Sequence, residues 1–185
     1  MRVLREHRER VADERRRAAV AMLAGVAALD LGVIALRQLG VVRHLPDPPV
    51  RGAESDRVVM SKAAFPLGIP DAPVGMASML VTLALVQRRD AECAERRAWI
   101  AIATAAKTAV DAGVALRYAR VQLRRERAWC AWCFAGAALT VAIAGLALPE
   151  AIHAVRALAR ERAGNAATAR DSGARDVRTQ RGRHT

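Results

Sequence analysis

Apolar residues gather in four long runs along the chain, and charged residues fill the stretches between them. The runs are Ala18–Leu36, Pro66–Val86, Ala98–Leu116 and Ala128–Leu148. A helix over the first run would be about 28 Å long, which matches the hydrocarbon core of a bilayer. The pattern therefore predicts an all-α protein in which residues 18–148 form a bundle of four transmembrane helices.

The chain between the first two runs is irregular. Residues 43–65 contain several residues that interrupt regular structure: Pro46, Pro48, Pro49 and Gly52. The second run itself opens with P-L-G-I-P-D-A-P-V-G and becomes continuously apolar only near Val74. Non-helical backbone is tolerated at membrane depth only where protein or a cavity covers it. We therefore expect an irregular or half-helical loop between the first and second helices.

The formal net charge of +12 comes almost entirely from arginine. Such a basic chain suggests a nucleic acid or an anionic membrane surface as partner. Aromatic residues make up only 3% of the chain, and the basic blocks flank apolar runs. This distribution favours contact with lipid headgroups and argues against nucleic-acid binding.

Four spans would place both ends of the chain on the same side of the membrane. The segment 1–17, the loop 87–97 and the tail 149–185 are basic, so the positive-inside rule predicts that they are cytoplasmic. We expect the protein to lie in the inner or plasma membrane of the cell. The tail lacks periodicity from about Gly164 and is predicted to be disordered. The arginines of 117–127 would then lie outside, which opposes this orientation unless the third helix carries them to the headgroups.

The sequence W-C-A-W-C places Cys130 and Cys133 at the start of the last run. Positions i and i+3 share a face of a helix, and a helix N-terminus favours a thiolate. Such a pair can cycle between dithiol and disulfide, but two cysteines can also simply pack in a membrane helix. The spacing alone does not distinguish a redox function from simple packing. A zinc site is disfavoured because it needs about four ligands, and Cys93 and the histidines are not near in sequence.

Two further segments accompany this pair. Residues 61–75 read S-K-A-A-F-P-L-G-I-P-D-A-P-V-G, and Gln122-Leu123 stands ahead of the C-A-W-C motif. In this order these motifs resemble the vitamin K epoxide reductase family, whose bacterial members show a loop serine, an aromatic residue, G-I-P, a glycine and later Q-L before C-x-W-C. The resemblance covers about residues 20–145.

The resemblance implies a membrane thiol–disulfide oxidoreductase, with four helices around a quinone such as menaquinone or ubiquinone. The reduced C-x-x-C pair would pass its electrons to the quinone, and the disulfide formed in this way would oxidise an external dithiol, for example a thioredoxin-like protein. By position, Cys133 would face the quinone and Cys130 would exchange with incoming thiols. Ser61 matches the family's loop serine near the active site, and Asp71 matches a polar group directed at a quinone oxygen.

The sequence also departs from this family. The loop 43–65 has no cysteine, and Ser55 stands where the second loop cysteine would fall. Ala137 stands where vitamin K-reducing members often carry a tyrosine. Cys93 cannot replace the loop cysteines, because it lies at the other end of the third span, about 30 Å away. The alternative hypothesis is a non-catalytic relative that acts in partner binding or assembly.

Three ionisable residues, Asp30, Lys107 and Asp111, fall within the apolar runs. Each costs about 2.5–3.5 kcal/mol on insertion scales, so such residues usually face a partner or a cavity. Lys107 and Asp111 are at i and i+4 and can pair on one helix. We favour a structural ion pair that ties the third helix to Asp30 of the first helix, with a proton path for quinone reduction as the alternative.

Overall fold

The computed structural model describes residues 2–88 and 94–181, and most of these are helical. The long helices are α1 (Arg2–Gln38), α3 (Asp71–Arg88), α4 (Ala94–Val121) and α5 (Ala131–Arg181). The short elements are α2 (Ser55–Val59), two 3₁₀ turns at Lys62–Ala64 and Pro66–Gly68, and a π-helical turn at Gln122–Glu126. No strand occurs within these described ranges, so the predicted all-α class is confirmed.

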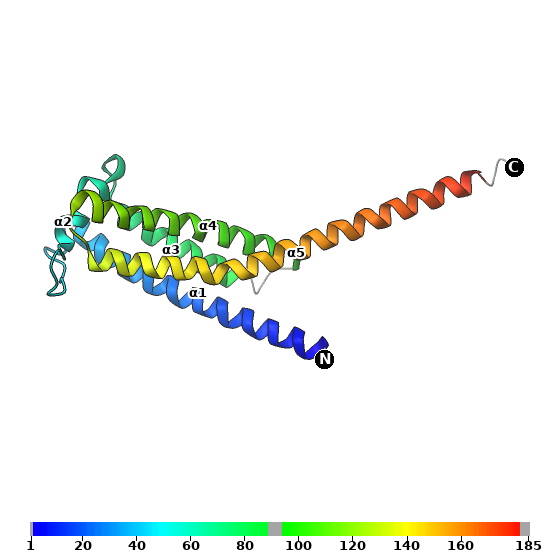
Figure 1. The fold of residues 1–185 in the computed structure, drawn as a ribbon, viewed down its shortest axis with the longest axis horizontal. Helices are drawn as coiled ribbons and strands as arrows, with labels where there is room; N and C mark the ends of the chain where they lie inside the picture. Colours follow the sequence, from blue (N-terminus) through cyan, green and yellow to red (C-terminus); the bar gives the residue numbers. More distant parts are fainter. Residues whose placement is uncertain (1, 89–93, 182–185) are drawn as a thin grey trace.

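The four long helices lie side by side over much of their length (Figure 1). α1 packs against α3 and α5, and α4 packs against α5. A buried apolar cluster joins α1, α3 and α5, and it includes Val20, Ala24, Ala27, Met79 and Ile143. Small residues such as these alanines let membrane helices approach closely and gain van der Waals contact.

Three helical segments are long and apolar enough to cross a membrane: Val11–Gln38, Ala98–Glu126 and Ala131–Asn165. They correspond to the first, third and fourth predicted runs, and they indicate a multi-pass membrane protein. The second run forms α3, which has 18 residues and packs along α1. Of the four predicted spans, three are therefore supported by length and composition.

α1 and α5 extend well beyond the apolar runs that predicted them (Figure 1). α1 begins at Arg2, so the basic residues 2–17 continue the first membrane helix. α5 continues through Pro149 to Arg181, where we predicted a disordered tail. Residues 151–163 are rich in alanine and arginine, and these strong helix formers offset the helix-breaking tendency of the proline.

The segment between α1 and α3 lies at the end of the bundle opposite the projecting ends of α1 and α5 (Figure 1). As predicted, it is irregular, with α2 and the two 3₁₀ turns as its only helical pieces in the described chain. Leu67 (φ +60°) and Gly68 (φ +79°) both adopt left-handed conformations before α3 begins. This pair of residues turns the chain back toward the bundle.

Asp56 anchors this segment to the end of α1. Its carboxylate accepts hydrogen bonds from Arg37 Nε (2.6 Å) and the Leu45 amide (3.2 Å), and its second oxygen lies 3.0 Å from His44 Nδ1. Burial opposes ionisation, but the bonds from Arg37, His44 and Leu45 outweigh it and hold the pKa of Asp56 below its ordinary value. The attachment is therefore complete at neutral pH and is lost only as the pH falls through this lowered pKa.

Candidate functional site

The C-x-x-C pair lies where the turn after α4 leads into α5. Arg127 adopts a left-handed conformation (φ +50°) in this turn. The side chain of the buried Gln122 accepts a hydrogen bond from the amide of Cys130 through Oε1, at 3.2 Å. The glutamine of the Q-L motif therefore fixes Cys130 just ahead of the first turn of α5.

Residues 45–59, here called the covering loop, close over this turn. The amide of Trp129 donates a hydrogen bond to the carbonyl oxygen of Gly52 (2.9 Å), and Trp132 Nε1 donates to the carbonyl oxygen of Pro46 (3.1 Å). Gly52 has φ +80°, and a Cβ there would lie 3.4 Å from the Trp129 ring. The two tryptophans of W-C-A-W-C thus bind the covering loop on either side of Cys130.

Cys130 is completely buried beneath the covering loop. It belongs to an apolar cluster with Ile34 of α1 and with Val58 and Val59 of the loop. Both Cys130 and Cys133 are free thiols, and the amide of Cys133 donates a hydrogen bond to Cys130 Sγ at 3.2 Å. The Cys130 sulfur therefore lies at the N-terminus of α5, where the amide dipoles favour negative charge.

The surroundings of Cys130 stabilise its thiolate. The strongest influence is a hydrogen bond from the Cys133 thiol, which stabilises the thiolate. Burial has the opposite effect and disfavours the charged form. The Ser55 hydroxyl and the backbone amides of Cys133 and Trp132 stabilise the thiolate further. Together these groups lower the pKa of Cys130 to about 7. A thiol whose pKa lies near ambient pH suits thiol–disulfide exchange, because it combines a large thiolate fraction with good nucleophilicity.

We expect the ultraviolet thiolate absorbance of the reduced protein to rise with a midpoint near pH 7, the pKa of Cys130. Subtracting the spectrum of a Cys130→Ser variant assigns the signal to this residue. A Cys133→Ala variant loses the strongest stabilising hydrogen bond, so the midpoint should move up toward the ordinary cysteine value of about 8.5. An identical midpoint in the two proteins would contradict this account of Cys130.

A cavity of about 490 Å³ opens beside Cys133. Its walls come from α1, α3, α4, α5 and the segment before α3, and most of them are apolar. Three residues predicted from the sequence, Ser61, Asp71 and Cys133, line this one cavity, whereas Cys130 does not reach it. The volume and lining are those of a site for a small apolar molecule with a few polar groups.

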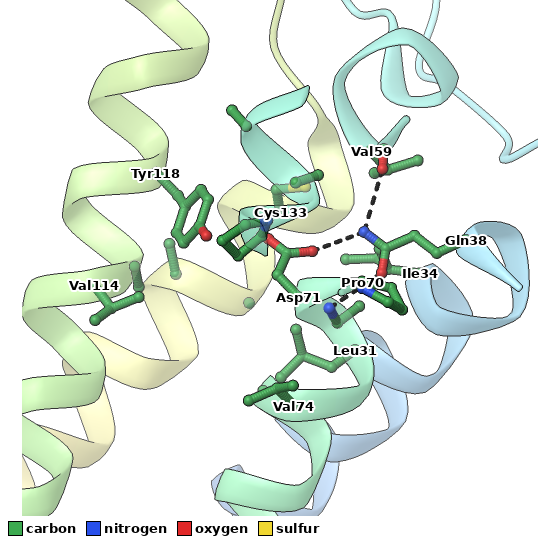
Figure 2. A pocket seen from close by; sticks show the side chains of 18 of the residues that line it. Leu31, Ile34, Gln38, Val59, Pro70, Asp71, Val74, Val114, Tyr118 and Cys133 are labelled. Carbon is green, nitrogen blue, oxygen red and sulfur yellow. Dashed lines mark hydrogen bonds between the residues drawn. The ribbon is translucent and has the colours of Figure 1, made fainter. Parts of the chain in front are cut away.

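Asp71 lies at the wall of this cavity and is held there by Gln38 (Figure 2). Gln38 Nε2 donates hydrogen bonds to Asp71 Oδ1 (2.7 Å) and to the carbonyl oxygen of Val59 (3.2 Å). Gln38 Oε1 accepts a hydrogen bond from the amide of Ala72 (3.1 Å). One buried side chain therefore joins the end of α1, the covering loop and the start of α3, and it fixes the orientation of the Asp71 carboxylate.

Sequence reasoning missed Gln38 and Tyr118. Tyr118 lies on α4 across the cavity from Gln38, and its hydroxyl points toward Asp71 (Figure 2). It is the only tyrosine in a chain with few aromatic residues, and this rarity could have marked it as a candidate site residue. Its place in the arginine-rich stretch 117–127 obscured that signal, because the stretch has no apolar periodicity.

The sequence of residues 18–148 matches the vitamin K epoxide reductase family. This range covers well over half of the chain and contains the covering loop, the cavity and both cysteines of the C-x-x-C pair. The chain belongs to the vitamin K epoxide reductase family. A comparison with curated proteins gave no match. Because vitamin K epoxide reductase family members are in general oxidoreductases, the match supports a redox-related function in the membrane.

Ser55 stands where the resemblance to the family led us to expect the second loop cysteine. It is fully buried. Its amide donates to the carboxylate oxygens of Asp47 (3.0 and 3.1 Å). Its hydroxyl favours the Cys130 thiolate but makes no hydrogen bond of ordinary geometry in the described structure. The remaining cysteine, Cys93, lies outside the described residues.

Lys107 and Asp111 form the predicted ion pair on α4 of this vitamin K epoxide reductase family member, with Nζ and Oδ2 2.6 Å apart. Lys107 Nζ also donates to Thr82 Oγ1 (2.6 Å) and to the carbonyl oxygen of Ser78, and Ser78 Oγ donates to Asp111 Oδ1 (3.0 Å). The pair therefore ties α4 to α3. The predicted contact with Asp30 is wrong, because Asp30 approaches Gly136 on α5 instead.

Proposed function

We propose that this protein is a quinone-dependent thiol–disulfide oxidoreductase of the membrane. The observation that carries the proposal is the position of Cys133, which lines the cavity and whose amide and thiol both bond to the buried Cys130. A cysteine pair placed in this way can take electrons from a thiol through Cys130 and give them to a ligand in the cavity through Cys133.

The cavity suits a quinone such as menaquinone or ubiquinone. Its apolar walls can hold a ring and part of an isoprenoid tail, and its polar lining includes Ser61, Asp71 and Tyr118. We expect the Tyr118 hydroxyl to donate a hydrogen bond to one quinone oxygen, in place of the tyrosine that the family often carries where this chain has Ala137. Ser61 and Asp71 would orient the ring, with Asp71 accepting a hydrogen bond from the quinol hydroxyl.

The proposed reaction begins with a disulfide between Cys130 and Cys133. A thiolate of an external dithiol, such as a thioredoxin-like protein, attacks the Cys130 sulfur, so that a mixed disulfide forms and Cys133 leaves with the electron pair. The second thiol of the partner breaks the mixed disulfide and leaves both cysteines reduced. The reduced pair then closes its disulfide again, and the quinone takes up the two electrons and two protons to become a quinol.

The covering loop must move before a dithiol reaches Cys130, because this cysteine has no exposed surface. The bonds from Trp129 to Gly52 and from Trp132 to Pro46 would have to break, at about 1 kcal/mol each. Residues 43–65 contain no cysteine that could carry electrons through the chain. The external dithiol therefore reacts with Cys130 directly.

We place the protein in the inner or plasma membrane of the cell, with α3 as the fourth span. Its 18 residues give a helix about 27 Å long, close to the thickness of the hydrocarbon core. The basic residues 1–17 and 149–185 would lie on the cytoplasmic side. The covering loop, at the opposite end of the bundle, would then face the outside, where a dithiol substrate meets it.

Thiol labelling followed by mass spectrometry tests the proposed function. The protein is purified in lipid nanodiscs, reduced with dithiothreitol, exposed to ubiquinone or menaquinone, denatured in acid and labelled. We expect Cys130 and Cys133 to be labelled before the quinone is added and to be joined as a disulfide afterwards, with a matching amount of quinol. The labelling of Cys93 should not change, which provides a control within the same chain.

A cysteine pair that stays reduced with both quinones would contradict the proposal. It would favour the alternative, a non-catalytic member of the family that acts in partner binding or assembly. The absence of loop cysteines and the burial of Ser55 beside Cys130 are the features that such a member would have.

A further inference from the structure

Asp30 is an acidic residue in the membrane-crossing part of α1 that the proposed function does not use. Its Oδ2 atom is buried and has no hydrogen-bond partner among the residues that the structure describes. Lys107 cannot neutralise it, because the three donors of the Lys107 ammonium group are directed at Ser78, Thr82 and Asp111. A carboxyl oxygen that is buried without a partner is costly in an apolar span, and ionisable residues there usually have a function.

The carboxyl group of Asp30 lies against α5 one turn beyond Cys133. A Cβ placed on Gly136 would lie 2.7 Å from Asp30 Oδ2, so only glycine leaves room for the carboxyl group at this point. Gly136 and Cys133 both line the cavity. Asp30 is also close enough to Cys133 for the two groups to interact electrostatically. α1 and α5 therefore bring an ionisable oxygen behind the cavity wall at Gly136, one turn of α5 from Cys133.

We propose that Asp30 exchanges a proton with Cys133 during quinone reduction, an inference that rests on the proposed function. Closing the Cys130–Cys133 disulfide releases two electrons and two protons, and the quinone takes up two of each to become a quinol. The Asp30 carboxylate accepts the thiol proton of Cys133 and returns it to the reduced quinone past Gly136. The other proton enters the quinol from water, in exchange for the one that Cys130 releases.

The two half-reactions separate this role from a purely structural one. In an Asp30→Asn variant, which keeps the size of the side chain, we expect single-turnover quinone reduction by the prereduced protein to be about 100-fold slower. Oxidation of dithiothreitol by the preformed Cys130–Cys133 disulfide should keep its normal rate, because that step does not use the cavity. Asp30→Glu should restore part of the quinone half-reaction. Gly136→Ala should slow it as well, because the added methyl group displaces the carboxyl group.

The matched control is Asp13→Asn, which removes another acidic residue from the same helix. Asp13 differs from Asp30 in being paired with Arg16. This variant should leave both half-reactions unchanged. Asp30→Asn with wild-type quinone reduction overturns the inference, and so does an equal loss of both half-reactions, which would mark Asp30 as structural. If the wild-type protein itself reduces no quinone, the proposed function has failed instead, so the two failures are distinguishable.

Discussion

Replacing Cys133 with alanine is expected to reduce quinol formation to the background rate when the purified protein is given a dithiol and a quinone. Cys133 is the cysteine of the pair that lines the cavity, and without its sulfur no disulfide can form with Cys130. Electrons would then have no route from the thiol to the ligand. The measurement is the quinol absorbance during steady turnover in lipid nanodiscs, at several quinone concentrations.

Cys93→Ala provides the matched control, because it also removes one thiol from the chain but leaves the C-x-x-C pair intact. It should retain full turnover. Equal rates for the wild-type protein and Cys133→Ala would disprove the proposed chemistry, whatever the structure of the bundle.

Lys107→Met is expected to have the largest effect on stability. The substitution keeps the side chain long and apolar but leaves Asp111 without its counter-charge inside a membrane-crossing helix. Both side chains are only partly buried within the bundle, and an unpaired charge in a membrane span costs about 2.5–3.5 kcal/mol on insertion scales. The thermal unfolding of the protein in detergent micelles, followed by circular dichroism, measures the loss.

The double variant Lys107→Met/Asp111→Leu removes both charges and should recover most of the lost stability, because no unpaired charge remains. The two variants together measure the cost of isolating Asp111. If the single variant unfolds at the same temperature as the wild-type protein, the ion pair does not stabilise the contact between α3 and α4.

The sequence predicted those parts of the fold that depend on local pattern. Long apolar runs predicted the helices that became α1, α4 and α5, because a segment in lipid must satisfy its own backbone hydrogen bonds. The P-L-G-I-P segment predicted the irregular start of the second run. The family resemblance implied that Ser61, Asp71 and Cys133 lie near a bound quinone, and all three residues line one cavity.

Contacts between distant segments were not predictable, because no periodicity describes them. The partner of Lys107 depends on how α3 and α4 are rotated, and this rotation directed it to Thr82 rather than to Asp30. Gln38 looked like the polar end of an apolar helix until the fold brought Asp71 beside it. The tail after residue 148 was predicted to be disordered from its composition, although its alanine content also favours the helix that is observed.

The positions of the covering loop and the cavity bear on how the two proposed substrates would reach the cysteine pair. The loop closes the cysteine pair from the end of the bundle, whereas the cavity reaches Cys133 from between the helices. The water-soluble reductant and the lipid-soluble oxidant that we propose would therefore not compete for the same space, and they would be coupled only through the oxidation state of one S–S bond. In the proposed reaction the two half-reactions would alternate through the oxidised and reduced forms of the cysteine pair, as in a double-displacement mechanism with two separate substrate sites.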